Sequence, residues 1–392
     1  MDFALSDELL ELQQAVRAFA RREIAPVAAA LDRDPRFPWP TLRRMGEMGL
    51  LGVLTPEAYG GLGLGHLAYA VLLEEVAAAD ASHATIASVT NGLPQAMILR
   101  HGTEVQRRRW LPRLASGEWI GAFCLTEAHA GSDAAALRTR AVPVDGGYRL
   151  RGSKAWITSG GEAHLYLVLA RTDPTTEAGA RGITAFVVER DAPGLSFGAP
   201  ERKLGQHAAI TAGAVLDDVF VPSDQRLGAE GQGFVLAMDA LDGGRVGIAA
   251  QALGIGRAAL DAALAHAGER RAFGRPIREF QGVAFRLADV ALRLDAARLL
   301  THRAAWALDR AARATKEAAM AKLAASEASV DACDAAIQVL GAYGYSADYP
   351  VERYWRDARV TTIYEGTSEI QRVVIARQLH REHGRSVPEP VT

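Results

Sequence analysis

The chain contains little cysteine and no long uninterrupted apolar run, and each scarcity excludes a class of protein. Its 392 residues include only two cysteines, Cys124 and Cys333, which lie far apart in the sequence and match no metal-ligand spacing. We therefore expect no metal site, and a reduced intracellular protein is the default expectation. Apolar runs such as Leu165 to Ala170 are far shorter than the roughly 18 residues that a spanning helix requires.

An excess of charge of either sign is also missing. The sequence has 44 Lys plus Arg against 46 Asp plus Glu, so no overall field draws it to nucleic acid or to an anionic membrane, although a local site for an anion stays open. The N-terminus has acidic residues among helix-spaced leucines and lacks the basic flank and apolar core of a secretory signal. We therefore expect a cytoplasmic protein with neither a nucleic-acid nor a membrane partner.

Three blocks of different periodicity follow one another along the chain. Helical spacing runs from Ser6 to about Leu137, and short β-rich segments without intervening helices, including a hairpin around Asp145-Gly146-Gly147, fill about 138 to 226. Alanine-rich helices then return at about 233–268, 279–310, 314–340 and 369–381. This order predicts an all-α block, an antiparallel sheet or barrel and a helical bundle, and it excludes a simple doubly wound sheet.

Two glycine patterns satisfy a loose dinucleotide fingerprint, Gly63 to Ala68 and Gly254 to Ala259. The first follows a loop that contains Pro56, and the second lies inside a helical pattern. Neither has the strand, tight turn and helix that would aim amides at a pyrophosphate. We therefore expect packing or turn glycines, and any dinucleotide would bind without a Rossmann unit.

The carboxylate most suited to chemistry is Glu365, in the run Tyr364-Glu365-Gly366-Thr367-Ser368-Glu369. Ser368 and Gln371 have the spacing of a capping box, which places Glu365 just ahead of a helix N-terminus. Apolar neighbours would raise its pKa and the helix dipole would lower it, so Glu365 is a candidate proton acceptor near neutral pH. On this segment alone, an ordinary surface glutamate is the commoner interpretation.

Other segments offer binding groups, each with a plainer alternative. The loop Phe123 to Asp133 could approach a flat polar ligand closely, or merely connect domains. Trp156, in the run Lys154 to Gly161, could cover a conjugated ring, or belong to the core. Arginines between Arg270 and Gln281 suit phosphate, or lie on the surface. Asp242 to Arg245 are interpreted as a helix start whose amides could meet an anion, and Gln338 to Tyr345 as a glycine-rich helix end.

Taken in this order, the segments resemble the acyl-CoA dehydrogenase family over essentially the whole chain. The first signature of that family is similar to Cys124 to Asp133 and the second to Gln338 to Asp357, while Tyr364 to Glu369 resembles the segment that holds the base in short- and medium-chain members. Lys154 to Thr158 and Glu269 to Gly274 add to the match. The resemblance implies an N-terminal all-α domain (1–121), a central antiparallel β domain (122–232) and a C-terminal four-helix bundle domain (233–392).

The resemblance also implies FAD as cofactor, bound across a subunit interface of a homotetramer built as a dimer of dimers. The residues implied in FAD binding are Phe123, Leu125, Thr126, Gly131, Ser132, Trp156, Ile157, Thr158, Arg270, Phe273, Gln281, Gln338, Val339, Gly341, Ala342, Thr367, Ser368 and Glu369. Those implied in binding the acyl-CoA are Ser132, Asp242, Gly243, Gly244, Arg245, Tyr364 and Gly366.

In such an enzyme Glu365 would take the α-proton of the acyl thioester while the β-hydrogen leaves as hydride to FAD, giving a trans-2-enoyl thioester. Isovaleryl and long-chain members supply their base from the helix where this chain has Gly244, which leaves Glu365 as the base. The segment Leu241 to Gln251 is most similar to short-chain and short branched-chain members. A small acyl group and an electron-transfer flavoprotein as electron acceptor are therefore expected.

Departures from the family pattern keep other interpretations open. Ala128-His129 replaces Pro-Gly in the first signature, Ala342 replaces a frequent glycine, and Lys203 to Ile210 lacks the usual arginine and serines. A thioester on a carrier protein is one alternative substrate. An oxidase or a monooxygenase on the same scaffold is another, although a monooxygenase has no need of Glu365. A non-catalytic scaffold, which would be colourless, is the alternative from a different class.

Overall fold

The structure is a computed structural model that describes residues 3–384 except 174 and 312. Its contacts divide the chain into two compact units. Unit 1 comprises Met1–Arg21, Ala70–Ala81 and Arg245–Thr392, and unit 2 comprises Arg22–Tyr69 and Ser82–Gly244. The long helix α8 (Gly233–Glu269) passes from unit 2 to unit 1 after Gly244.

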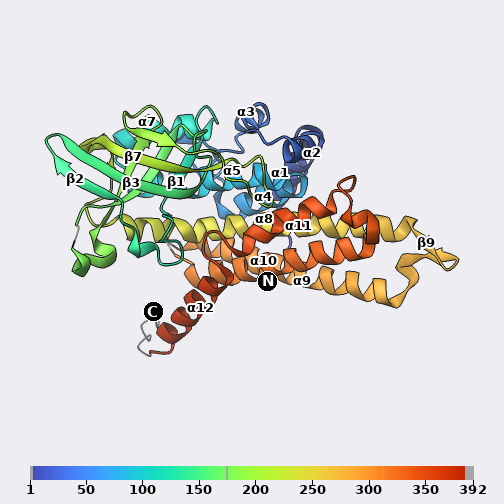
Figure 1. Ribbon diagram of the computed structural model, residues 1–392. Helices are drawn as coiled ribbons and strands as arrows, with labels where there is room; N and C mark the ends of the chain where they lie inside the picture. Colours follow the sequence, from blue (N-terminus) through green and yellow to red (C-terminus); the bar gives the residue numbers. More distant parts are fainter. Residues whose placement is uncertain (1–2, 174, 312, 385–392) are drawn as a thin grey trace. The chain divides into compact units, whose positions relative to one another are not determined.

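Unit 2 contains one sheet with the strand order β6-β7-β3-β2-β4-β5-β8, and β1 pairs with β4 off this path. Figure 1 labels β1, β2, β3 and β7 of this sheet. Its strands are β1 (Gly121–Cys124), β2 (Arg140–Val144), β3 (Gly147–Thr158), β4 (Leu165–Arg171), β5 (Ile183–Glu189), β6 (Leu195–Phe197), β7 (Thr211–Pro222) and β8 (Arg226–Leu227). The pairings are antiparallel except for β1 with β4 and β2 with β4, which are parallel. The expected antiparallel β region is confirmed. β1 lies inside the stretch from Ser6 to about Leu137 whose periodicity predicted helix, although the resemblance places all of it but Gly121 in the β domain.

Within unit 2, α6 (Ala96–His101), α7 (Glu104–Ala115) and the start of α8 share one apolar core with β4, β5 and β8. The unit also contains α2 (Ala25–Arg33), α3 (Trp39–Glu47), the start of α4 (Gly65–Ala79) and most of α5 (Ala81–Thr90). Thr103 and Gln106 form a capping box that begins α7, and the helix then buries Trp110, whose Nε1 donates to Glu189 of β5 at 3.0 Å. Leucines of β4 pack in the same cluster. The apolar face of the strand and the apolar face of α7 therefore share one core.

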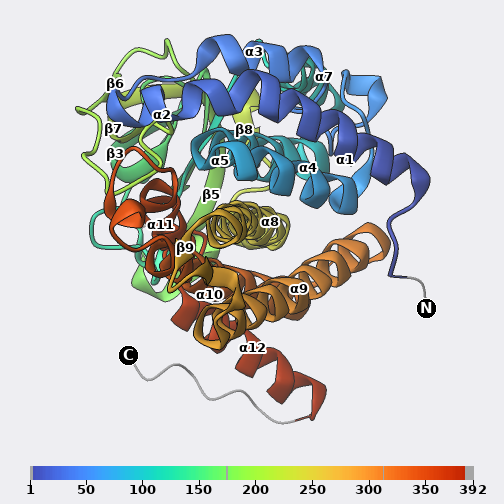
Figure 2. The same ribbon diagram turned by 90° about the vertical axis from the view of Figure 1, so that its right-hand side faces the viewer.

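Unit 1 is helical, and α10 is its central element. Its helices are α1 (Asp7–Phe19), the end of α4 (Gly65–Ala79), α8 from Arg245, α9 (Gln281–Arg310), α10 (Thr315–Leu340), α11 (Val351–Arg359) and α12 (Ser368–Glu382). α10 packs against α9, α11 and α12, and Figure 2 shows α8 and α10 nearly end-on. The four long helices agree with the sequence expectation to within two residues. The domain boundaries after residues 121 and 232 stay a prediction.

Glycines of α8 allow close helix packing. A Cβ on Gly254 would lie 2.3 Å from the carbonyl oxygen of Glu74, and one on Gly256 would meet Leu294 of α9 and Ser329 of α10. The absence of a side chain is therefore required for these helices to approach. The expectation that Gly254 serves packing rather than a dinucleotide is consistent with this geometry. By length and composition α8 alone among the described residues could span a membrane, but 61% of the relevant window is buried.

A buried ionic cluster joins four elements of unit 1. Arg17 of α1 and Arg257 of α8 both donate to the carboxylate of Glu75, with contacts of 2.8 to 3.0 Å. Arg298 of α9 donates to the neighbouring Glu74 at 2.9 Å. Because paired guanidinium groups satisfy both buried carboxylates, α1 and the end of α4 are fixed to the helices that carry the site described next.

Candidate active site

Glu365 lies in a tight loop between the short helix at Val360–Thr362 and α12. Its φ is +50° and that of Gly366 is +91°. The left-handed conformation costs roughly 1–2 kcal/mol for a residue with a side chain, and such strain is concentrated at functional sites. The fully buried Gln371 holds the loop, since its Nε2 donates to the carbonyl oxygens of Glu365 at 3.1 Å and Gly366 at 2.9 Å.

The expected capping box at this helix is wrong. Thr367, not Ser368, is the N-cap, and its Oγ1 accepts from the amide of Ile370 at 3.3 Å. The left-handed turn at Glu365 and Gly366 directs their carbonyl groups to Gln371, so this side chain bonds to the loop rather than reciprocating at the cap. The expectation that Glu365 precedes a helix N-terminus is correct.

The carboxylate of Glu365 is desolvated. Although the residue as a whole is half-buried, both carboxylate oxygens have almost no exposed surface and neither accepts a hydrogen bond from any residue that the structure describes. Burial raises the pKa of Glu365 to about 7, against the opposing charges of Arg245 and Lys322. The group can therefore exchange a proton near neutral pH.

Two cations of neighbouring helices act on this carboxylate. Arg245 of α8 is 6% exposed and was predicted from the sequence as a substrate contact. Lys322 of α10 was not predicted; its side chain is completely buried, and its Nζ donates to the carbonyl oxygen of Gly366 at 2.8 Å. Two features of the sequence could have indicated Lys322. It is a lysine among small residues, in Ala-Ala-Met-Ala-Lys-Leu-Ala-Ala, and helical spacing assigns its position in α10 to the core.

Tyr364 is fixed by a side chain that the sequence did not single out. Its hydroxyl donates to Oε1 of Gln251 at 2.8 Å, and Nε2 of Gln251 donates to the carbonyl oxygen of Ala81 at 3.0 Å. On the other side of the base, a Cβ on Gly366 would lie 2.7 Å from Nε2 of Gln371. Tyr364, Glu365 and Gly366 are thus held by α8, α10 and α12 of the same unit.

In unit 2, the loop that follows β1 is fastened by a buried ion pair. Glu127 accepts from Nζ of Lys154 at 2.8 Å, from the amide and hydroxyl of Thr139 at 2.9 and 2.6 Å, and from the amide of Arg138 at 2.7 Å. Burial alone would raise the pKa of Glu127, but Lys154 and these donors hold it at about 2. The carboxylate therefore stays ionised and fixes the path of the loop.

The two segments of unit 2 that were predicted to bind a flat ring are brought together. The amide of Ala155 donates to the carbonyl oxygen of Thr126 at 3.0 Å. Trp156 follows at a break in the β3–β7 register, with φ of +59° and 60% of its surface exposed, so the core-tryptophan alternative is wrong. Thr126 and Thr158 are partly exposed, and an exposed indole beside two hydroxyls suits a planar ligand with a polar edge.

The other FAD contacts predicted in this loop and in β3 differ in how exposed they are. Gly131 has open space where a Cβ would be, and Ser132 is exposed, whereas Leu125 and Ile157 are buried. His129, one of the two residues that stand in place of Pro-Gly in the first signature, is exposed, and its Nε2 lies 3.7 Å from Oε2 of Glu127. The imidazole therefore lies next to the ion pair that fastens the loop.

Most of the predicted nucleotide contacts of unit 1 lie at one end of α8, α9 and α10, whereas Thr367, Ser368 and Glu369 lie beside the first half of α10, where Lys322 bonds to Gly366. Phe273 is 95% exposed with φ of +49°, at the turn of the hairpin β9 (Arg271–Ala272) and β10 (Arg275–Pro276). Arg270 lies over the ring of Tyr343 at 5.9 Å, which joins the hairpin to the end of α10. The remaining residues are at helix ends: Gln281 begins α9, Gln338 and Val339 end α10, Gly341 and Ala342 follow it, and Thr367, Ser368 and Glu369 begin α12.

One expectation about α8 is wrong. Asp242, Gly243, Gly244 and Arg245 do not open a helix, because α8 begins at Gly233 and continues through them. Their amides are consequently inside the helix, where they bond to carbonyl groups four residues earlier rather than to an anion. Any contact of this segment with a ligand must come from its side chains.

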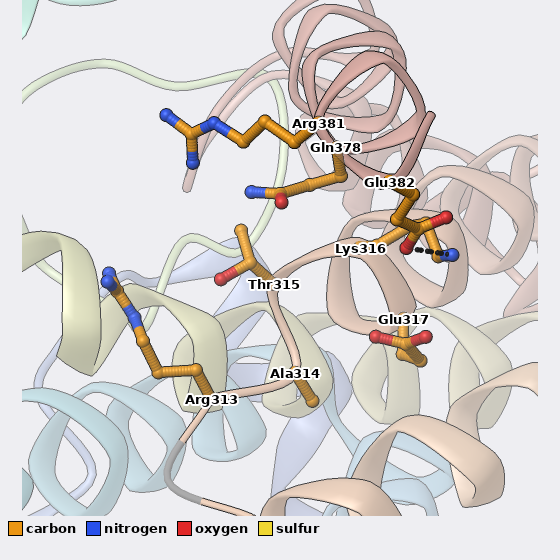
Figure 3. Close-up of a pocket in the computed structure, with 8 residues that line it drawn as sticks. All are labelled: Arg313, Ala314, Thr315, Lys316, Glu317, Gln378, Arg381 and Glu382. Carbon is orange, nitrogen blue, oxygen red and sulfur yellow. Dashed lines mark hydrogen bonds and ion pairs between the residues drawn. The ribbon is translucent and has the colours of Figure 1, made fainter. Parts of the chain in front are cut away.

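A cavity of about 360 Å³ lies elsewhere in unit 1, between the start of α10 and the end of α12 (Figure 3). Its lining is charged and includes Lys316, which is paired with Glu382. The full lining is Arg313, Ala314, Thr315, Lys316, Glu317, Gln378, Arg381 and Glu382. None of the predicted site residues is among them, so this cavity is not the site of Glu365.

Comparison with known proteins gives matches along nearly the whole chain. Residues 6–118, 122–219 and 231–380 match the sequence profiles of the N-terminal, middle and C-terminal domains of acyl-CoA dehydrogenase. The mitochondrial short-chain specific acyl-CoA dehydrogenase of Mus musculus is 48% identical over 372 residues, which cover 95% of this chain and 90% of that protein.

Solved structures show the same fold. Butyryl-CoA dehydrogenase from Megasphaera elsdenii superposes with a TM-score of 0.94 and 40% identity, covering 97% of this chain and 100% of that one. A prolyl acyl carrier protein oxidase superposes with a TM-score of 0.93 and 34% identity, covering 96% of this chain and 100% of that one. These likenesses extend over both units.

Proposed function

Because the chain belongs to the acyl-CoA dehydrogenase family, whose members are FAD-dependent oxidoreductases, we propose that it oxidises a short acyl-CoA with Glu365 as the base. The observation that carries the assignment is the carboxylate of Glu365, which is buried, lacks a hydrogen-bond partner among the described residues and has a pKa of about 7. A carbon acid offers no strong hydrogen bond, so a base for it must be desolvated and ionised near neutral pH.

In the proposed reaction Glu365 removes the α-proton of the thioester, and the product is a trans-2-enoyl thioester. The chemistry that FAD would supply there is acceptance of the β-hydrogen as hydride. The left-handed backbone at Glu365 and the clamp from Gln371 fix the direction of the carboxylate before substrate arrives. Since Gly244 has no side chain, the position of α8 that would supply the base in isovaleryl and long-chain members offers none here.

The chain offers groups suited to FAD in both units. The loop from Phe123 to Ser132 and the exposed Trp156 would hold the ring system, while Glu127 and Lys154 keep that loop in place. The exposed Phe273 and the helix ends near it would meet the nucleotide part bound by another subunit. This arrangement goes with the proposed homotetramer, a dimer of dimers.

A short acyl chain and a flavoprotein electron acceptor are the finer parts of the proposal. The relatives named for short-chain and butyryl substrates support the first. An electron-transfer flavoprotein would accept the electrons, and the cytoplasm would be the compartment.

The proposal is tested by anaerobic titration of the yellow protein with butyryl-, isobutyryl-, octanoyl- and palmitoyl-CoA while flavin absorbance is followed. We expect the short thioesters to bleach the flavin. The variant Glu365→Gln should keep FAD and its spectrum but fail to bleach, because the amide cannot accept the α-proton. Normal bleaching by Glu365→Gln would refute the assignment of the base, and a protein that cannot take up FAD would support a non-catalytic scaffold.

A carrier-protein thioester is the second candidate substrate. The likeness to a prolyl acyl carrier protein oxidase favours this alternative, and so does the departure at Lys203 to Ile210. In that segment Nδ1 of His207 is hydrogen-bonded to the carbonyl oxygen of Asp32 at 2.8 Å, and its Nε2 to the carbonyl oxygen of Lys203 at 3.0 Å. Bleaching by an acyl carrier protein thioester but not by the matching acyl-CoA would decide for the carrier, and oxygen consumption with substrate would indicate an oxidase.

A further inference from the structure

Lys322 is buried more completely than a lysine usually is. Its side chain has no exposed surface, and lysine is almost never fully buried unless it is paired. Removing an ammonium group from water is costly unless opposite charge compensates it. The interior of α10 therefore carries a charge that packing alone does not explain.

The charges that act on Lys322 come from several elements. Burial lowers its pKa to about 8; Glu365 of the loop, Glu369 of α12 and Glu327 of α10 raise it, while Arg245 of α8 lowers it. Glu365 is the largest of the attractive charges. Reciprocally, Arg245 and Lys322 are the two cations that oppose the upward shift of the pKa of Glu365.

The hydrogen bond that Lys322 makes is not its distinctive contribution. Its Nζ bonds to the carbonyl oxygen of Gly366 at 2.8 Å, but Nε2 of Gln371 reaches the same oxygen at 2.9 Å and the carbonyl oxygen of Glu365 at 3.1 Å. The loop thus has a neutral clamp already. What Lys322 adds to that clamp is a positive charge.

We propose that Lys322 is a positioning residue for the base: its buried ammonium group keeps the Glu365 carboxylate ionised, and therefore able to accept a proton, at neutral pH. The proposal rests on the proposed function for the identity of the proton that Glu365 accepts. The electrostatic claim itself concerns only groups of unit 1. Lys322 bonds to the residue next to Glu365 and, after Arg245, is the second cation that opposes the upward shift of its pKa. Because a nearby opposite charge lowers the pKa of a carboxyl group by about 1–3 units, loss of the ammonium group should raise the pKa of Glu365.

Infrared spectroscopy of the substrate-free holoenzyme tests the claim directly. The carbonyl band of protonated Glu365, assigned by its absence in Glu365→Gln, is followed from pH 5 to pH 10. In Lys322→Met the midpoint should rise by about 1–3 units, and Lys322→Arg, which keeps the charge, should return it towards the wild-type value. Lys316→Met is the matched control, because Lys316 lies on the same helix and pairs with Glu382 instead; it should leave the midpoint unchanged.

The pH profile of flavin reduction by butyryl-CoA provides the second readout. If the pKa of the base rises by one unit in Lys322→Met, the rate at pH 7 should fall about fivefold and recover at pH 9, because the ionised fraction is restored. A uniform loss at every pH, with an unmoved infrared midpoint, would show that Lys322 is merely structural and overturn the proposal. Lys322→Gln is the second neutral variant if Lys322→Met does not fold. If no thioester bleaches the wild-type flavin, the proposed function fails, but the infrared midpoint still decides the role of Lys322.

Discussion

At the scale of single residues, the burial of the Glu365 carboxylate has a consequence for stability. Its pKa rises from 4.5 to about 7 on folding, so the ionised form is less favourable in the folded protein than in the unfolded chain. The contribution of Glu365 to the free energy of unfolding therefore falls as the pH rises from 4.5 to 7, by up to about 3 kcal/mol. This cost is typical of a functional site.

The isosteric variant Glu365→Gln should remove that cost. We expect it to be more stable than the wild type at pH 8, by up to about 3 kcal/mol, and equally stable at pH 4.5, where the wild-type group is already protonated. Chemical unfolding at the two pH values measures the difference. Glu369→Gln is the control four residues away; this side chain is exposed and its pKa is lowered, so no gain at pH 8 is expected. A gain in both variants would contradict the argument.

Sequence reasoning found Glu365 and Arg245, one of the two cations that act on its pKa, but not the other residues around the base. The resemblance identified Glu365 and Arg245 because short motifs carry both. Lys322 lies outside those motifs, and Gln251 is only the last residue of the segment Leu241 to Gln251. The function of both residues depends on which helices meet around the loop. The wrong prediction of a capping box has the same cause. Gln371 could bond either to the N-cap of α12 or to the loop before it, and the left-handed backbone at Glu365 directs it to the loop.

At the scale of elements, the long helices were predicted closely because their periodicity is a local property. The strand β1 was missed, since it has four residues and forms by parallel pairing with β4, in which Gly121 opposes Leu165. No pattern inside the strand itself indicates such a partner. The same applies to the ionic cluster of unit 1, which depends on four separate elements.

The ionic cluster should be a large contributor to the stability of unit 1. Glu75→Ala would leave Arg17 and Arg257 without their shared carboxylate, and removal of one partner of a buried ion pair costs about 3–5 kcal/mol. Hydrogen exchange should show α1 opening first, because Arg17 fixes it to α4. The matched control is Glu327→Ala, whose pair with Arg372 is exposed and should contribute less than about 1 kcal/mol. Equal losses in the two variants would show that the cluster has no special role.

At the scale of the whole molecule, α9 carries an apolar stripe on its exposed side. Phe285, Leu292, Leu299 and Trp306 are each seven residues apart and between 44% and 70% exposed. A spacing of seven places them along one face of the helix. Exposed apolar side chains gathered in this way are typical of protein–protein contact, and a second copy of the chain is the occupant that the proposed homotetramer requires.

Charges introduced into this stripe should therefore reduce the size of the assembly. We expect Leu292→Glu with Leu299→Glu to sediment as a smaller species than the wild type in analytical ultracentrifugation, because burying two carboxylates against a second copy is costly. The circular dichroism of the variant should be unchanged, since both side chains are already exposed in the single chain. Val105→Glu provides the control, as Val105 of α7 is 75% exposed but belongs to no such stripe. Assembly that survives both substitutions would show that α9 is not a subunit contact, and the surface through which copies associate would then have to be sought on other elements.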